Sequence, residues 1–115
     1  IMNKKSQQEY EEMIEQSKEE EYILKLYVSG MTPKSRKAVS NVKEICETHL
    51  KGRYTLRVID LYQNPKLAKG EQIVAMPTLI KKLPPPLRKI IGDMSDKDKL
   101  LVGLDLVKIN EEEKD

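Results

Sequence analysis

Few residues in this chain have side chains suited to chemistry. Cys46 is the only cysteine and His49 the only histidine among the 115 residues, and they lie three positions apart. This spacing would place both on one face of a helix, but two ligands are too few for a metal site and no others accompany them. We therefore interpret Cys46 as a buried apolar residue and His49 as a surface group at a helix end. The same histidine would have to serve as the base for any serine nucleophile, and no serine stands in such a pairing.

Carboxylates and glycines do not indicate an active site either. Asp60, Asp93 and Asp105 fall at the ends of predicted elements, where a carboxylate more simply caps a strand or turn. The glycines lack the spacing of a phosphate-binding loop. We predict no catalytic residue, no metal and no cofactor, and we expect a protein that is not an enzyme.

The composition favours one small domain in a reducing compartment. A lone cysteine excludes an internal disulfide, so we expect the cytoplasm. No apolar run reaches membrane-spanning length, and no signal-peptide pattern opens the chain.

Residues 22–109 carry seventeen basic and eight acidic groups, whereas residues 1–21 have a net charge of −4 and residues 110–115 of −3. This distribution fits an anionic partner or screening by the chain's own acidic ends. Nucleic acid is disfavoured because the basic residues are scattered and no tyrosines alternate with them.

The first half of the chain reads as strand, helix and strand. Residues 22–28 (YILKLYV) predict a mostly apolar strand. Thr32 suits a helix N-cap and Pro33 the first helical position, and apolar residues then recur at spacings of three and four to about Leu50. Gly52 supplies a left-handed stop before a second strand over residues 53–60. Two strands joined by a helix of this length should be parallel.

The second half is more broken. We expect a short helix over residues 64–71, a strand over 78–83, a stiff break at three prolines and a short strand over 87–91. Ser95 with Asp98 resembles a capping box that would open a final helix over residues 96–107. The order β-α-β-α-β-β-α predicts a thioredoxin-like α/β fold.

One local feature of this chain resembles thioredoxin-like proteins, and another sets it apart from them. The stretch Ala75-Met-Pro-Thr-Leu79 places Pro77 before the third strand, where that superfamily carries a proline that is usually cis. The redox loop of thioredoxins, with its Cys-x-x-Cys pair, corresponds to residues 30–35 here, which contain no cysteine. Dithiol exchange is therefore excluded. This favours a protein that works by binding another protein.

A closer resemblance covers residues 22–107. The strings Tyr22-Ile-Leu-Lys-Leu-Tyr-Val-Ser-Gly30, Asn64-Pro-x-Leu-Ala68 and Leu83-Pro-Pro-Pro-Leu-Arg-Lys-Ile-Ile-Gly-Asp-Met-Ser95 are similar to those of the KaiB family of circadian clock proteins. The resemblance implies a regulatory partner of a KaiC-like ATPase and autokinase, and a further interaction with a KaiA-like or other signalling protein. It also implies two folds: a KaiC-binding thioredoxin-like monomer, and a resting homo-oligomer (dimer or tetramer) with a rearranged β-α-β-β-α-α-β order.

The resemblance also suggests roles for particular residues. Lys37 and Arg57 match partner-binding basic positions, although plain surface charge fits them equally well. Pro77, Gly92 and Asp93 match positions that contribute to the fold of the family or to its change of fold. For Gly92 and Asp93, an ordinary turn before the last helix explains the residues equally well.

The expected organisation is an acidic N-terminal extension (1–21, helical or disordered), a KaiB/thioredoxin-like domain (22–109) and an acidic tail (110–115). The alternative function is a stress-response protein that binds a thiol or glutathione beside Pro77, or reacts through Cys46.

Overall fold

The computed structural model describes residues 20–106. The acidic tail at 110–115, all but the last two residues of the N-terminal extension, and Val107 at the expected end of the final helix lie outside this range. The boundaries predicted for these segments therefore stay predictions.

The first half forms the predicted unit. Strand β1 (Tyr22–Val28) leads into helix α2 (Pro33–His49), and strand β2 (Tyr54–Asp60) pairs parallel to β1 along its full length. The hydroxyl oxygen of Thr32 accepts a hydrogen bond from the Ser35 backbone N–H at 3.2 Å, so Thr32 is the N-cap as predicted. Gly52 has a φ of +80°, which a residue with a Cβ adopts only with strain.

Strands from the second half complete one mixed sheet. Strand β3 (Thr78–Leu83) pairs antiparallel with β1, and β4 (Arg88–Ile91) pairs antiparallel with β3, which gives the order β2-β1-β3-β4. The three prolines predicted to break the chain form the connection between β3 and β4. The Met76–Pro77 peptide bond is cis, as the resemblance implied.

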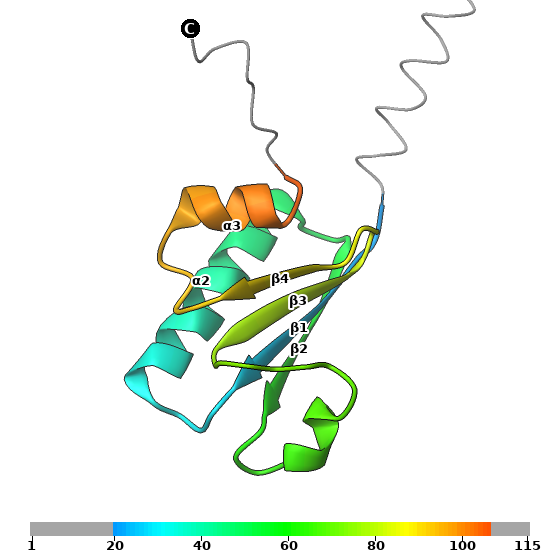
Figure 1. Cartoon of the computed structure of the whole chain (residues 1–115). Coiled ribbons are helices and arrows are strands. Elements are labelled where there is room, and N and C mark those ends of the chain that lie inside the picture. The colour runs from blue at the N-terminus through cyan, green and yellow to red at the C-terminus, as the bar shows by residue number, and fades with distance from the viewer. Residues whose placement is uncertain (1–19, 107–115) are drawn as a thin grey trace, which may run out of the picture.

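The sheet separates two apolar clusters, and the α-helices within residues 20–106 cover only one of its faces (Figure 1). The larger cluster lies between the sheet and helices α2 and α3, the latter spanning Lys97–Gly103. It consists almost entirely of aliphatic side chains, with Leu24 and Leu26 of β1 fully buried at its centre. A smaller cluster around Tyr27, Ile59 and Ile80 lies on the other face, beneath the segment 61–77. We call that second side the outer face.

Two predictions in the second half were wrong in detail. The helix expected over 64–71 is a single 3-10 turn, η1 (Pro65–Ala68), and the backbone then enters left-handed conformations at Gly70 and Gln72. The final helix has Asp96, not Ser95, as its N-cap: the Asp96 carboxylate accepts from the Lys99 N–H at 3.1 Å. The Ser95 N–H instead donates to the side chain of Asp93 at 3.0 Å.

Helix α3 also ends earlier than predicted, at Gly103. Asp105 follows in the left-handed region with a φ of +61°. The Leu106 N–H donates to the Leu101 carbonyl and the Asp105 N–H to the Val102 carbonyl, which is the Schellman pattern that closes a helix. The sequence did not predict this helix end, because Asp105 occupies the position that glycine usually takes.

Candidate functional site

The loops that hold the redox residues in thioredoxin-like proteins lie together at one end of the sheet. Strand β1 ends there, helix α2 begins there, and the pairing of Tyr27 with Thr78 brings Pro77 beside the end of β1. The Gly92 N–H donates to the Pro77 carbonyl at 2.9 Å, so the turn after β4 joins the same end. The loop between β1 and α2 thus faces the Pro77 segment, as a redox loop would.

Hydrogen bonds hold this end in place. The side chain of Asp60 accepts from the N–H groups of Gly30 and Tyr62, both at 2.9 Å, and so ties the β1–α2 loop to the end of β2. This confirms Asp60 as a strand-end cap. The Asn41 side-chain amide donates to the Asp93 carbonyl at 3.0 Å and joins α2 to the turn after β4.

Four of the five residues singled out from the sequence lie at this end. Pro77, Gly92 and Asp93 are joined by the contacts above, and Lys37 is exposed on α2 near the Asp93 carboxylate. Hydrogen bonds from Ser95 lower the pKa of Asp93 below its ordinary value, and the charges of Lys37 and Lys34 contribute in the same direction. Their expected roles in partner binding and fold switching stay predictions.

Arg57 does not belong to this group. It is exposed in the middle of β2 and shares the outer face with Ile59, on the side of the sheet opposite α2. If Lys37 and Arg57 both contact partners, they do so from different sides of the domain.

No thiol lies near the loop of residues 30–35. Cys46 is fully buried on α2, about 20 Å along the helix from Pro33 at 1.5 Å per residue. Burial, together with the nearby Glu47 charge, raises the pKa of its thiol to about 12. The thiol therefore stays protonated at neutral pH and is shielded from reagents, which argues against the reactive version of the thiol-binding hypothesis.

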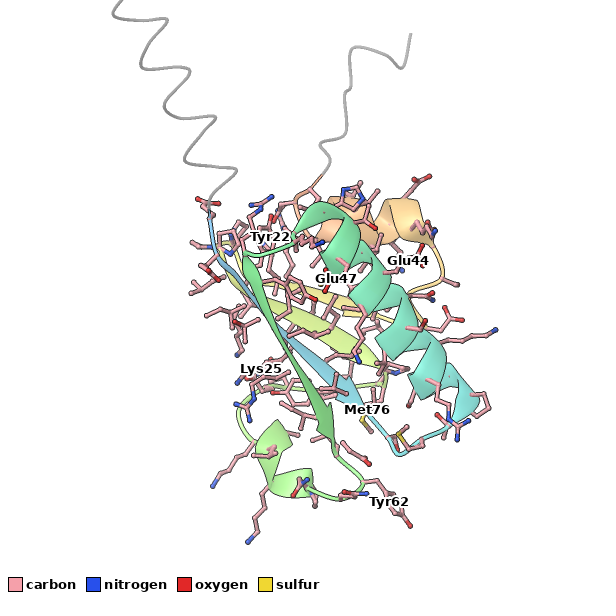
Figure 2. All side chains as sticks on the ribbon, turned by 180° about the vertical axis from the view of Figure 1, so that it is seen from behind. Tyr22, Lys25, Glu44, Glu47, Tyr62 and Met76 are labelled. Carbon is pink, nitrogen blue, oxygen red and sulfur yellow. The ribbon has the colours of Figure 1, made fainter. Side chains whose placement is uncertain are left out.

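The outer face carries a row of cations that the sequence reasoning did not identify. Lys25 of β1 is paired directly with Arg57 of β2. On its other side Lys25 is paired with Ile80 of β3, which in turn is paired with Lys89 of β4. Figure 2 shows Lys25 on the side of the sheet away from helix α2. Like charges on directly paired residues repel each other, so such a row needs a counter-charge.

Glu71, in the segment over this face, supplies that charge. Its carboxylate accepts from Lys82 at 2.7 Å and lies 3.9 Å from the Lys25 ammonium, while Lys89 donates to its backbone carbonyl at 2.6 Å. The hydrogen bond from Lys82 holds the pKa of Glu71 below its ordinary value despite partial burial. Lysines that interrupt apolar strands, such as Lys25 and Lys82, are the pattern that could have revealed this cluster.

A second surface feature is a groove between the first half of α2 and strand β2, which we call the α2–β2 groove. It has a volume of about 480 Å³, and Val28, Met31, Ser35, Arg36, Val39, Ser40, Lys43 and Val58 line it. Met31 is 71% exposed and Val58 43% exposed, so apolar surface is open to solvent here.

Within residues 20–106, no group of three or more His, Cys, Asp or Glu side chains is arranged to hold a metal ion. In the same range, no helix is both long and apolar enough to cross a membrane.

Fold and site together define a thioredoxin-like protein in which the loop at the redox position has no cysteine. Comparison with known proteins gives the family: the KaiB domain model matches residues 25–106. The circadian clock oscillator protein KaiB of Picosynechococcus sp. is 59% identical over 86 residues, covering 75% of this chain and 83% of the relative. That of Trichodesmium erythraeum is 55% identical over 94 residues, covering 80% and 90%. The chain belongs to the KaiB family, a family of clock regulatory proteins.

Solved structures support the fold. The N-terminal domain of Synechococcus elongatus SasA has a TM-score of 0.61 at 25% identity, covering 79% of this chain and 90% of that domain. Mitochondrial thioredoxin 3 of Saccharomyces cerevisiae also has a TM-score of 0.61, at 17% identity, covering 85% and 90%. The structure therefore has the thioredoxin-like fold expected from the sequence, and not the rearranged β-α-β-β-α-α-β order.

Proposed function

We propose that this chain is a non-enzymatic regulator that binds a KaiC-type ring ATPase and modulates its autophosphorylation. The observation that carries the proposal is the 59% identity over 86 residues to a circadian clock oscillator protein, in a chain whose residues 25–106 match the KaiB domain model. A loop without a thiol at the redox position, and a Cys46 thiol that is buried and protonated, support binding rather than catalysis.

Lys37 and Arg57 are the proposed contact residues. Both side chains are exposed, and neither forms an ion pair with any residue in the range 20–106. A partner carboxylate could therefore approach either cation without displacing an existing partner. Because they lie on different sides of the domain, they would report on two contact regions.

Comigration of the purified chain with its cognate KaiC-type ATPase on size exclusion, in ATP and in ADP, tests the proposal. We expect a complex whose amount depends on the nucleotide, and a dissociation constant raised about tenfold or more by Arg57→Glu or Lys37→Glu, as reversal of a contact charge typically does. Lys51→Glu is the matched control, because Lys51 is an exposed cation in the turn after α2.

The outcomes separate the parts of the proposal. Absence of a complex in every nucleotide state would contradict the function itself. A complex that Arg57→Glu, Lys37→Glu and Lys51→Glu weaken equally would contradict only the assignment of the contact residues.

A further inference from the structure

Strand β4 forms one edge of the sheet, because the order β2-β1-β3-β4 leaves one of its sides open. The Gly92 N–H donates to the Pro77 carbonyl, so these two residues form a hydrogen-bonded pair that continues the β3–β4 ladder, and by alternation Ile90 is bonded to β3 as well. Lys89 and Ile91 therefore direct their N–H and C=O groups away from β3. Within residues 20–106, none of these four groups takes part in a backbone hydrogen bond.

A groove runs along this open edge, between β4 and helix α3, which lie next to each other in Figure 1. We call it the β4–α3 groove; its volume is about 770 Å³, and its lining includes Lys89, Ile90, Ile91, Asp98, Val102 and Gly103. Ile91 and Val102 are partly exposed, so both strand and helix present apolar surface to solvent here. Neighbouring strands lie about 4.8 Å apart, so a strand added to β4 would enter this groove. An edge strand beside an apolar groove is suited to binding an extended peptide.

Helix α3 and strand β4 run in opposite directions along the groove. Asp96, the N-cap of α3, lies beside Ile91 at the end of β4. Asp105, which follows α3, accepts a hydrogen bond from Arg88 at the start of β4. The start of α3 therefore marks one end of the groove, and the start of β4 marks the other.

The two ends differ in charge. At the start of α3, the carboxylates of Asp96 and Asp98 outnumber the single cation of Lys99. Towards the start of β4, Lys89 provides a cation whose ammonium donates to the Glu71 backbone carbonyl. Lys89 forms no ion pair with any residue in the range 20–106. A strand added antiparallel to β4 should therefore begin with a basic residue and end with an acidic one.

We propose that β4 binds an extended peptide segment of another protein, which adds antiparallel to β4 in the β4–α3 groove. The open backbone groups set its register, because the residues opposite Lys89 and Ile91 can each exchange two hydrogen bonds with β4. An acidic residue opposite Lys89 and an apolar residue opposite Ile91 make favourable cross-strand pairs. The residue between them faces Ile90 and Val102 and should be apolar, and the residue before all three should be basic, beside Asp96. The segment that fits thus has the order basic, apolar, apolar, acidic.

NMR titration of the isotope-labelled full-length chain with the peptide acetyl-Thr-Lys-Val-Val-Glu-Thr-amide tests the proposal. We expect saturable shifts of the Lys89 and Ile91 amide signals and of the Val102 methyl signals, while the amides of β2, at the other edge, stay unchanged. N-methylation of the first valine or of the glutamate leaves an acceptor on β4 unsatisfied and should weaken binding about tenfold or more. N-methylation of the second valine, whose N–H points away from β4, should leave the affinity unchanged.

A charge exchange gives a second readout. Lys89→Glu should weaken binding of this peptide about fivefold, and a peptide with lysine in place of its glutamate should regain the affinity in that variant. Lys51→Glu, which replaces an exposed cation in the turn after α2, is the matched control and should change nothing.

Three results with the peptide would overturn the proposal: no saturable shift, equal weakening by all three N-methylations, or shifts confined to β2. Lys89 and Ile91 signals that move when the chain alone is diluted would also overturn it, because a second copy would then occupy the edge. None of these outcomes bears on KaiC-type binding, since neither Lys37 nor Arg57 lies at this edge.

Discussion

At the scale of single residues, the contact between Lys81 and Asp105 joins the end of α3 to the sheet. Lys81 is 1% exposed, and its ammonium donates to the Asp105 carboxylate and to the Pro84 carbonyl, the latter at 2.7 Å. Arg88 of β4 donates to the same carboxylate. A buried charge is tolerated only when it is paired and hydrogen-bonded, so Asp105 is what allows a lysine at this depth.

Replacing Asp105 by alanine should therefore destabilise the fold more than its own lost contacts suggest. Breaking a buried pair costs about 3–5 kcal/mol, and the partial exposure of Asp105 should reduce this to roughly 2–3 kcal/mol. Urea unfolding measures the cost. The double variant Lys81→Met/Asp105→Ala should recover much of it, because no unpaired charge then remains. Strictly additive losses would contradict this account of the pair.

The same carboxylate predicts an acid-sensitive fold. Burial opposes ionisation of Asp105, but hydrogen bonds from Lys81 and Arg88 outweigh it, so its pKa lies below the ordinary value of 3.8. A lowered folded-state pKa means that the stabilisation is present above 3.8 and is lost as the pH falls through the folded-state value. The free energy of unfolding should therefore decline below about pH 4, and less steeply in Asp105→Asn. Identical pH profiles for the two proteins would contradict the prediction.

Cys46 should react only in the unfolded protein. Its burial and raised pKa of about 12 predict slow modification by a thiol reagent at pH 8 under native conditions and rapid modification in denaturant. Stopped-flow absorbance of the reagent measures both rates. Fast modification of the native chain would revive the thiol-binding alternative.

At the scale of elements, α3 packs closely against the sheet at Gly103. A Cβ added there would lie 2.5 Å from the Cδ1 atom of Ile90 on β4. Gly103→Ala should therefore be destabilising, by about 1–3 kcal/mol as in other overpacked cores, although alanine is the better helix former. In an Ile90→Val background, which lacks Cδ1 but keeps the Cγ1 atom 2.8 Å from the added Cβ, the same change should cost less. Thermal unfolding of the four proteins checks this, and an unchanged cost in the valine background would contradict it.

Most elements were predictable because local chemistry determines them. Thr32 and Pro33 fix the start of α2 through a side-chain cap and a preset φ, and the apolar face of α2 is continuous. The end of α3 was not predictable, since it depends on Asp105 in a left-handed conformation held by distant Lys81 and Arg88. Alternation along β3 could have revealed Lys81, which lies on the same face as Leu79.

At the scale of the whole molecule, sequence could place the candidate site but not its surroundings. Pro77 and the loop without cysteine were located by resemblance alone, and the sheet brings them together. The cation row of the outer face depends on pairings between four strands. Glu71 contacts these cations from a loop whose sequence shows no helical or strand periodicity. Such contacts arise only from the tertiary structure.

Our central proposal is that this chain changes the phosphorylation of a KaiC-type ATPase. The most direct measurement follows the phosphorylated fraction of the cognate ATPase over time in ATP, with and without the full-length chain at saturating concentration. The account predicts an altered time course, and an effect reduced by Arg57→Glu but not by Lys51→Glu. Superimposable time courses with and without the unsubstituted chain would contradict it.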